Sequence, residues 1–196
     1  MMSYRRSGAG EPVFLLHGYA SSSAIWHSLI SDLEKQFDVI AIDWPGFGTS
    51  HMLPPYTKLE DFAEGLLELA QELKIPHFHV LGHSMSGFVV QQLLSQHKEA
   101  LLSAVLYGAG LKLDATRRFE SIETTLQRLH HDGAAVSAQR VIHSWFYDLD
   151  RDPHALQQCM HAADGMTVEA GSAAIKAMAN ADFTHLPAQV DVPTLI

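Results

Sequence analysis

The sequence Leu81-Gly82-His83-Ser84-Met85-Ser86-Gly87 is the most informative segment of this chain. A short apolar run, Phe78–Leu81, leads into it, and a helical pattern over residues 85–96 begins inside it. Ser84 therefore stands where a predicted strand turns directly into a predicted helix. On such a tight turn the residues two positions away must be small, and the serine hydroxyl is lifted clear of the sheet, beside N–H groups of the helix start. Those donors and the helix dipole can stabilise an oxyanion, so Ser84 is predicted to be a nucleophile.

The stretch departs from the pattern G-x-S-x-G at its second small position. Ser86 stands there, and Gly87 follows one residue later. Serine is small enough to fit, so we interpret the change as a tolerated variant. Short Gly/Ser patterns also arise by chance, and the alternative is a serine in an ordinary strand–helix turn. The rest of the chain must therefore support the interpretation.

The chain around this stretch alternates between strand-like and helix-like segments. Apolar runs stand at residues 13–16, 37–42, 78–81 and 102–107, and helical patterns lie near residues 21–33, 57–73 and 85–96. Thr57 and Glu60 fit a capping box at the start of the second helix. This alternation predicts an α/β fold with a mostly parallel sheet and helices on both faces.

The pattern changes after Gly110. The following segments are helix-like only, near residues 119–131, 134–147, 153–162 and 167–179, before a last apolar run, Val192–Ile196. We therefore expect a sheet core over residues 1–112, a helical cap insertion over 113–181, and a return to the core over 182–196, where a late strand begins.

Two further motifs follow the first two strands. His17-Gly18-Tyr19 comes after the first, and Asp43-Trp44-Pro45-Gly46-Phe47-Gly48-Thr49-Ser50 after the second. In this order and at these spacings, they and the Ser84 stretch resemble the α/β-hydrolase superfamily. The resemblance is to its cap-bearing branch of esterases, carbon–carbon bond hydrolases, haloperoxidase-like enzymes and epoxide hydrolases. It covers residues 4–110 strongly and Val192–Ile196 weakly.

The resemblance implies roles for individual residues. Ser84 matches the nucleophile, and the backbone N–H groups of Tyr19 and Met85 match the oxyanion hole. His17 and His83 are expected to pack or hydrogen-bond around the turn, and residues 43–50 to form a structural loop. Some relatives place Asp at the nucleophile position. Ser84 instead favours acyl transfer on a small-molecule ester, thioester, amide or activated ketone.

The remaining triad members, an acid and then a histidine, follow the nucleophile in this fold. The resemblance places them beyond a Val-Pro-Thr-Leu-Ile-like run, whereas this sequence ends at Ile196, and it implies strands before residue 13. We therefore expect a fold incomplete at both ends and a truncated hydrolase. Substitutes within the chain are Asp114 as acid and His143, His154, His161 or His185 as base. The alternative is a complete, non-catalytic binding or interaction module, which could self-associate through an exposed sheet edge.

Composition limits the remaining functions. With 13 Lys and Arg against 22 Asp and Glu, the net charge is −9, which argues against nucleic acid as the main partner. No apolar stretch reaches the length of a membrane span, and no signal peptide is recognised, so a cytoplasmic location is expected. Cys159, the one cysteine, cannot form an internal disulfide.

No cofactor or metal is expected. Residues 46–48 and 108–110 each lack the third glycine of a dinucleotide motif, and no His, Cys or Asp cluster has metal-ligand spacing. The cap has apolar residues that would suit either an apolar pocket lining or core packing. They are Phe119, Trp145, Phe146, Met160, Met166 and Met178.

Overall fold

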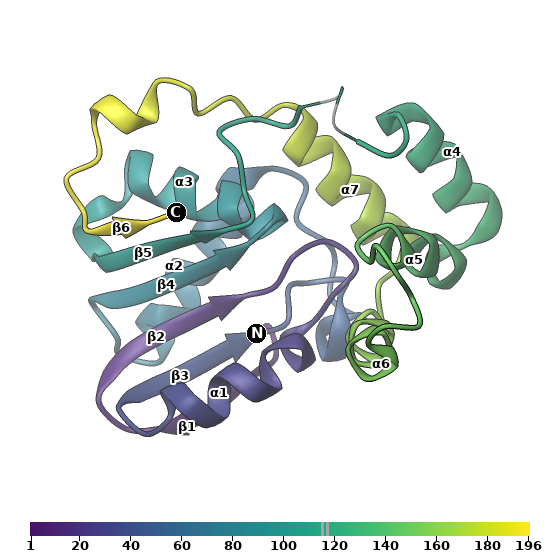
Figure 1. Cartoon of the computed structure of the whole chain (residues 1–196). Helices are drawn as coiled ribbons and strands as arrows, with labels where there is room; N and C mark the ends of the chain where they lie inside the picture. Colours follow the sequence, from purple (N-terminus) through teal and green to yellow (C-terminus); the bar gives the residue numbers. More distant parts are fainter. Residues whose placement is uncertain (115, 117) are drawn as a thin grey trace.

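The computed structural model describes residues 1–114, 116 and 118–196. Within them, strands form one six-stranded sheet in the order β1-β3-β2-β4-β5-β6 (Figure 1). The strands are β1 (Tyr4–Gly8), β2 (Glu11–Leu16), β3 (Phe37–Ile42), β4 (Phe78–His83), β5 (Leu101–Tyr107) and β6 (Thr194–Leu195). Strands β2 to β6 pair in parallel, and β1 pairs antiparallel with β3. The predicted mostly parallel sheet is confirmed.

Strand β1 at the sheet edge is an element that the sequence prediction missed. It carries two arginines and little apolar surface, because as an edge strand it faces water along most of its length. The Arg6 guanidinium binds the Asp38 carboxylate of β3 through two hydrogen bonds of 2.8 and 2.6 Å. A polar edge strand of this kind gives no apolar run to recognise.

Helices cover both faces of the sheet, as predicted. On one face Phe14 and Leu16 of β2 pack with α2 (Leu59–Glu72) and α3 (Met85–Gln96). On the other face Val13 and Leu15 pack with α1 (His27–Leu33) and the short 3₁₀ turn before it. The alternation follows from the two-residue period of a strand, and it makes β2 apolar on both sides.

The predicted capping box of α2 is wrong. The helix begins at Leu59, so Lys58 stands at the cap position and Asp61 in the first turn. The Asp61 carboxylate accepts hydrogen bonds from the N–H groups of Thr57 and Lys58, at 3.1 and 3.0 Å. Asp61, one residue beyond Glu60, therefore satisfies the free N–H groups there.

Four further helices lie beyond the carboxyl ends of the parallel strands (Figure 1, green to yellow). They are α4 (Ile122–Asp132), α5 (Ala134–His143), α6 (Pro153–Ala162) and α7 (Val168–Ala179). We call residues 122–179 the helical segment. All four were predicted, with two boundary differences. Helix α4 begins after residue 119 because the Ser121 hydroxyl caps it, and α5 ends at His143 and not at residue 147.

Backbone contacts on and beside the helical segment connect it to the core. Lys112 and Asp182 form an isolated antiparallel bridge where the chain leaves the sheet and returns to it. At the start of α7, the Thr167 N–H donates to the Gly46 carbonyl oxygen at 2.9 Å. After the return, β6 pairs with β5, which confirms a strand within the run 192–196. Among the described residues, no helix is both long and apolar enough to cross a membrane.

Candidate active site

Ser84 occupies a strained turn between β4 and α3. Its φ is 52° and its ψ is −109°, a backbone conformation that side-chain-bearing residues rarely adopt. A Cβ at Gly82 would lie 2.3 Å from the Ser86 carbonyl oxygen, and one at Gly87 would lie 2.2 Å from the Ala109 Cβ. The small residues around Ser84 are therefore a steric requirement of this turn.

The departure from the motif at Ser86 has a structural explanation. The Ser86 side chain is fully buried. Its hydroxyl accepts a hydrogen bond from the Trp44 indole N–H at 2.9 Å and donates to the His17 carbonyl oxygen. Ser86 thereby links the turn to the end of β2 and to the loop after β3, which a glycine could not do.

The loop after β2 lies directly against the turn. A Cβ at Gly18 would lie only 3.2 Å from the Ser84 Cβ and 3.0 Å from the His83 Nδ1. The backbone N–H groups of Tyr19, next in this loop, and of Met85, at the start of α3, have no hydrogen-bond partner among the described residues. Both N–H groups that the resemblance assigns to an oxyanion hole are thus free to bind a ligand.

His17 is a structural residue in this arrangement. It is fully buried, and its Nε2 accepts a hydrogen bond from the Trp44 N–H at 3.1 Å. Its Nδ1 lies 2.8 Å from the Gly18 carbonyl oxygen, so we assign the ring proton to Nδ1. Burial lowers the pKa of His17 to about 4. The neutral ring fixes the end of β2 against the loop that follows β3.

Asp43 organises that loop. Its carboxylate accepts hydrogen bonds from the Ser23 N–H at 2.6 Å, from the Thr49 N–H at 2.9 Å and from the Thr49 hydroxyl at 2.6 Å. Burial would raise the pKa of Asp43, but these hydrogen bonds outweigh it and hold the pKa below its ordinary value. The loop of residues 43–50 is therefore built around a buried carboxylate with a structural role.

His83, beside Ser84, is directed elsewhere. Its ring packs against Trp26, with centroids 6.2 Å apart, and against Tyr107, at 5.3 Å. Burial lowers its pKa. Neither His17 nor His83 lines the cavity at Ser84.

Ser84 opens onto a cavity of about 540 Å³ between the sheet and the helical segment. Tyr19, Phe88 and the turn after β5 line its sheet side. Of the six apolar residues that could line a pocket, Phe119, Trp145 and Met178 do so, and Phe146, Met160 and Met166 do not.

Of the substitute triad candidates, only Asp114 lines the cavity. Its carboxylate accepts hydrogen bonds from the Thr116 N–H at 2.9 Å and the Thr116 hydroxyl at 2.6 Å. No histidine lines the cavity among the described residues, which leaves out His143, His154, His161 and His185. The described part of the chain also holds no group of three or more His, Cys, Asp or Glu placed to bind a metal.

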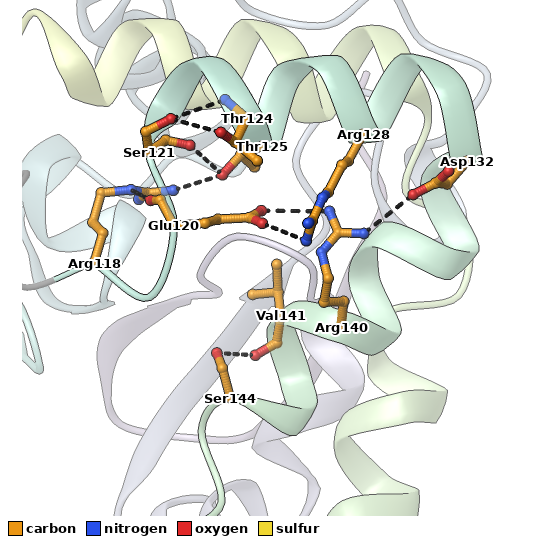
Figure 2. Close-up of polar contacts among 10 residues, drawn as sticks. All are labelled: Arg118, Glu120, Ser121, Thr124, Thr125, Arg128, Asp132, Arg140, Val141 and Ser144. Carbon is orange, nitrogen blue, oxygen red and sulfur yellow. Dashed lines mark hydrogen bonds and ion pairs between the residues drawn. The ribbon is translucent and has the colours of Figure 1, made fainter.

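Polar residues that the sequence reasoning missed also line the cavity. They are Lys112, Arg118, Thr125 and Ser144. Arg118 belongs to a polar cluster that joins α4 and α5 (Figure 2). These residues form no spacing pattern, because they come from separate turns that only the packing of the helices brings together.

Comparison with known proteins gives the family. The model of the alpha/beta hydrolase fold matches residues 11–154. An (E)-2-((N-methylformamido)methylene)succinate hydrolase of Acinetobacter baylyi is 24% identical over 98% of this chain and 73% of its own length. A pimeloyl-[acyl-carrier protein] methyl ester esterase of Aeromonas hydrophila is 34% identical over 53% of this chain and 40% of its own length. The chain thus spans only part of the relatives that it matches.

Solved structures agree on the fold. The enol-lactonase of Burkholderia xenovorans has a TM-score of 0.88 at 20% identity, over 98% of this chain and 75% of that one. A thermophilic esterase of Thermogutta terrifontis has a TM-score of 0.85 at 24% identity, over 98% of this chain and 72% of that one. On the family match, the shared fold and the turn at Ser84, this chain belongs to the α/β-hydrolase family.

Proposed function

We propose that Ser84 is the nucleophile of a hydrolase that cleaves a small acyl substrate through an acyl-enzyme. The observation that carries the proposal is the strained turn, which holds Ser84 on the cavity wall with the N–H groups of Tyr19 and Met85 beside it. The names of similar proteins, a methyl ester esterase and an enol-lactonase, favour an ester or lactone as the bond that is cleaved.

In this reaction the Ser84 Oγ forms a bond to the substrate carbonyl carbon, and the carbonyl oxygen gains negative charge. The N–H groups of Tyr19 and Met85 stabilise that oxyanion. The bond to the leaving group then breaks, and water later releases the acid and regenerates the serine. The serine proton must pass to a base and then to the leaving group. Among the described residues no histidine lines the cavity, so its lining supplies no imidazole for this proton.

We also propose the division of the chain into a core over residues 1–112, a cap over 113–181 and a return to the core over 182–196. The bridge between Lys112 and Asp182 supports these boundaries. Residues of the helical segment, Trp145 and Met178 among them, supply one wall of the cavity. The cap would thus select the substrate, while the core would carry the chemistry.

The second candidate function is a non-catalytic binding or interaction module. Two observations favour it. The described residues bring no imidazole to Ser84. Strand β6 leaves Leu195 exposed at the sheet edge, where another strand could pair.

A serine-reactive fluorophosphonate probe separates the two candidates. We expect slow labelling of the chain, loss of that labelling in Ser84→Ala, and retention in Ser144→Ala, which removes a different cavity hydroxyl. Mass spectrometry should locate the adduct on Ser84. Labelling that persists in Ser84→Ala would contradict the assignment of the nucleophile. A chain that folds but shows no labelling at all would favour the binding module.

A further inference from the structure

The cavity at Ser84 has one strongly charged residue held in a fixed position. Three charged residues line it, Lys112, Asp114 and Arg118. Lys112 and Asp114 are exposed, whereas Arg118 is half-buried. Arg118 lies in the turn before α4 and donates a hydrogen bond to Thr125 of that helix. This position suits a residue that binds one end of a substrate whose other end lies at Ser84.

Neutral acceptors orient the Arg118 guanidinium. Its Nε–H donates to the Glu120 carbonyl oxygen at 3.2 Å, and one terminal N–H donates to the Thr125 hydroxyl at 3.2 Å. Thr125 in turn donates to the Ser121 carbonyl oxygen at 3.0 Å. A guanidinium has five N–H donors, and two of them bind Glu120 and Thr125, so Arg118 keeps three donors for a ligand.

The neighbouring carboxylate is occupied by other arginines. Glu120, only 8% exposed in its side chain, binds Arg128 at 3.0 Å and Arg140 at 3.4 Å (Figure 2). Arg140 also contacts Asp132 at 3.4 Å. The cluster therefore holds three guanidinium groups and two carboxylates, and the arginine at the cavity is the one that neither carboxylate contacts.

Tyr19, which also lines the cavity, has a buried hydroxyl without a partner in the part of the chain that the structure describes. The Tyr19 side chain is 8% exposed, and its hydroxyl makes no hydrogen bond among the described residues. Burial raises the pKa of Tyr19 to about 12, so the hydroxyl keeps its proton. A buried hydroxyl without a hydrogen-bond partner is unfavourable unless a ligand forms a hydrogen bond with it.

We propose that the Arg118 guanidinium and the Tyr19 hydroxyl together bind a carboxylate of the substrate. The acyl substrate would then be a monoester or a lactone of a dicarboxylic acid, with its free carboxylate held at Arg118 and its reacting carbonyl at Ser84. A planar carboxylate matches the guanidinium fork, and Phe88, Val141 and Ile175 offer an apolar path for the short chain between the two ends. The inference rests on the proposed function, because it assumes that the cavity holds the acyl substrate.

The test is a binding measurement on Ser84→Ala, in which turnover is removed. Titration calorimetry compares the monomethyl esters of succinate, glutarate and adipate with the corresponding dimethyl esters. A charge-assisted hydrogen-bonded contact predicts about tenfold tighter binding of at least one monoester than of its dimethyl ester. Equal binding of each pair, or no measurable binding of any monoester, would overturn the proposal.

A second substitution, added to Ser84→Ala, identifies the residues that bind the carboxylate. Adding Arg118→Gln should remove the preference for the monoester over the dimethyl ester, and Arg118→Lys should keep part of it. Adding Tyr19→Phe, which keeps the backbone N–H, should reduce the preference a few-fold. Arg128→Gln is the matched control, because Arg128 pairs with Glu120 without lining the cavity, and it should keep the preference. A preference that survives in a folded Arg118→Gln variant would overturn the proposal.

The result is independent of the nucleophile assignment. If the fluorophosphonate labels Ser84 but no monoester preference is found, the carboxylate site is wrong and the hydrolase proposal stands. If the preference depends on Arg118 but Ser84 is never labelled, the carboxylate site stands and the hydrolase proposal fails.

Discussion

The turn at Ser84 and the helical segment are held together in different ways. Around the turn, Gly82 and Gly87 meet neighbouring atoms so closely that a single added carbon has no space. In the helical segment, the pairs of Arg128 and Arg140 with Glu120 join helices whose arginines reach solvent. Close packing tolerates little change, whereas ion pairs can be exchanged at small cost. Close packing therefore holds Ser84 in place, whereas ion pairs hold α4 and α5 together.

The largest expected effect comes from Gly82→Ala. The new Cβ would lie 2.3 Å from the Ser86 carbonyl oxygen, so the turn must distort. We expect a loss of at least about 3 kcal/mol in the free energy of unfolding, measured by urea denaturation. Gly110→Ala is the control, since its Cβ would have 3.4 Å to the nearest atom and should cost less than about 1 kcal/mol. Equal losses of stability in Gly82→Ala and Gly110→Ala would contradict the steric explanation of the turn.

A pH titration tests the buried histidine of the core. The folded-state pKa of His17 is about 4, below the ordinary value of 6.5, so the unfolded chain binds the proton first as pH falls. Stability should therefore decrease from about pH 6.5 to about pH 4, by about 3 kcal/mol, and this contribution should not change further below pH 4. Denaturation of wild type and His17→Gln across this window is the measurement. The same pH dependence in wild type and His17→Gln would contradict the assignment of this stability change to His17.

Ser86→Gly, which restores the G-x-S-x-G pattern, should destabilise the protein. It leaves the Trp44 indole N–H and the His17 carbonyl oxygen without their partner in a buried site. The expected cost is about 1–3 kcal/mol in thermal or urea denaturation. Ser144→Ala is the comparison: it removes the hydroxyl of an exposed residue that donates to the Val141 carbonyl oxygen, and it should cost less. A stabilised Ser86→Gly variant would show that the serine is only tolerated.

The smallest expected effect is in the helical segment. Arg128→Gln removes one ion pair with Glu120 and leaves Arg140 bound to it, and the Arg128 side chain is 50% exposed. We expect a loss of about 1 kcal/mol, smaller at high salt. Urea denaturation at low and high salt is the measurement. A loss as large as that of Gly82→Ala would mean that the two regions do not differ as described.

The parallel sheet, the helices and the place of Ser84 between a strand and a helix could be predicted from the sequence. Apolar runs and helical spacing are local signals, and the steric demand of the turn restricts residues that are adjacent in the chain. Strand β1 was not predicted, because a polar edge strand has no apolar run to recognise. The capping of α2 by Asp61 was misplaced because one residue of register decides which carboxylate reaches the free N–H groups.

The surroundings of Ser84 became visible only in the folded protein. The hydroxyl of Ser86 gained its role from Trp44 and His17, which lie far from it in the sequence. Arg118 lies in the turn before α4 and Tyr19 in the loop after β2, and no spacing in the sequence connects them. The physical reason is that backbone pattern follows from neighbouring residues, whereas the partners of a side chain depend on which distant segments pack against it.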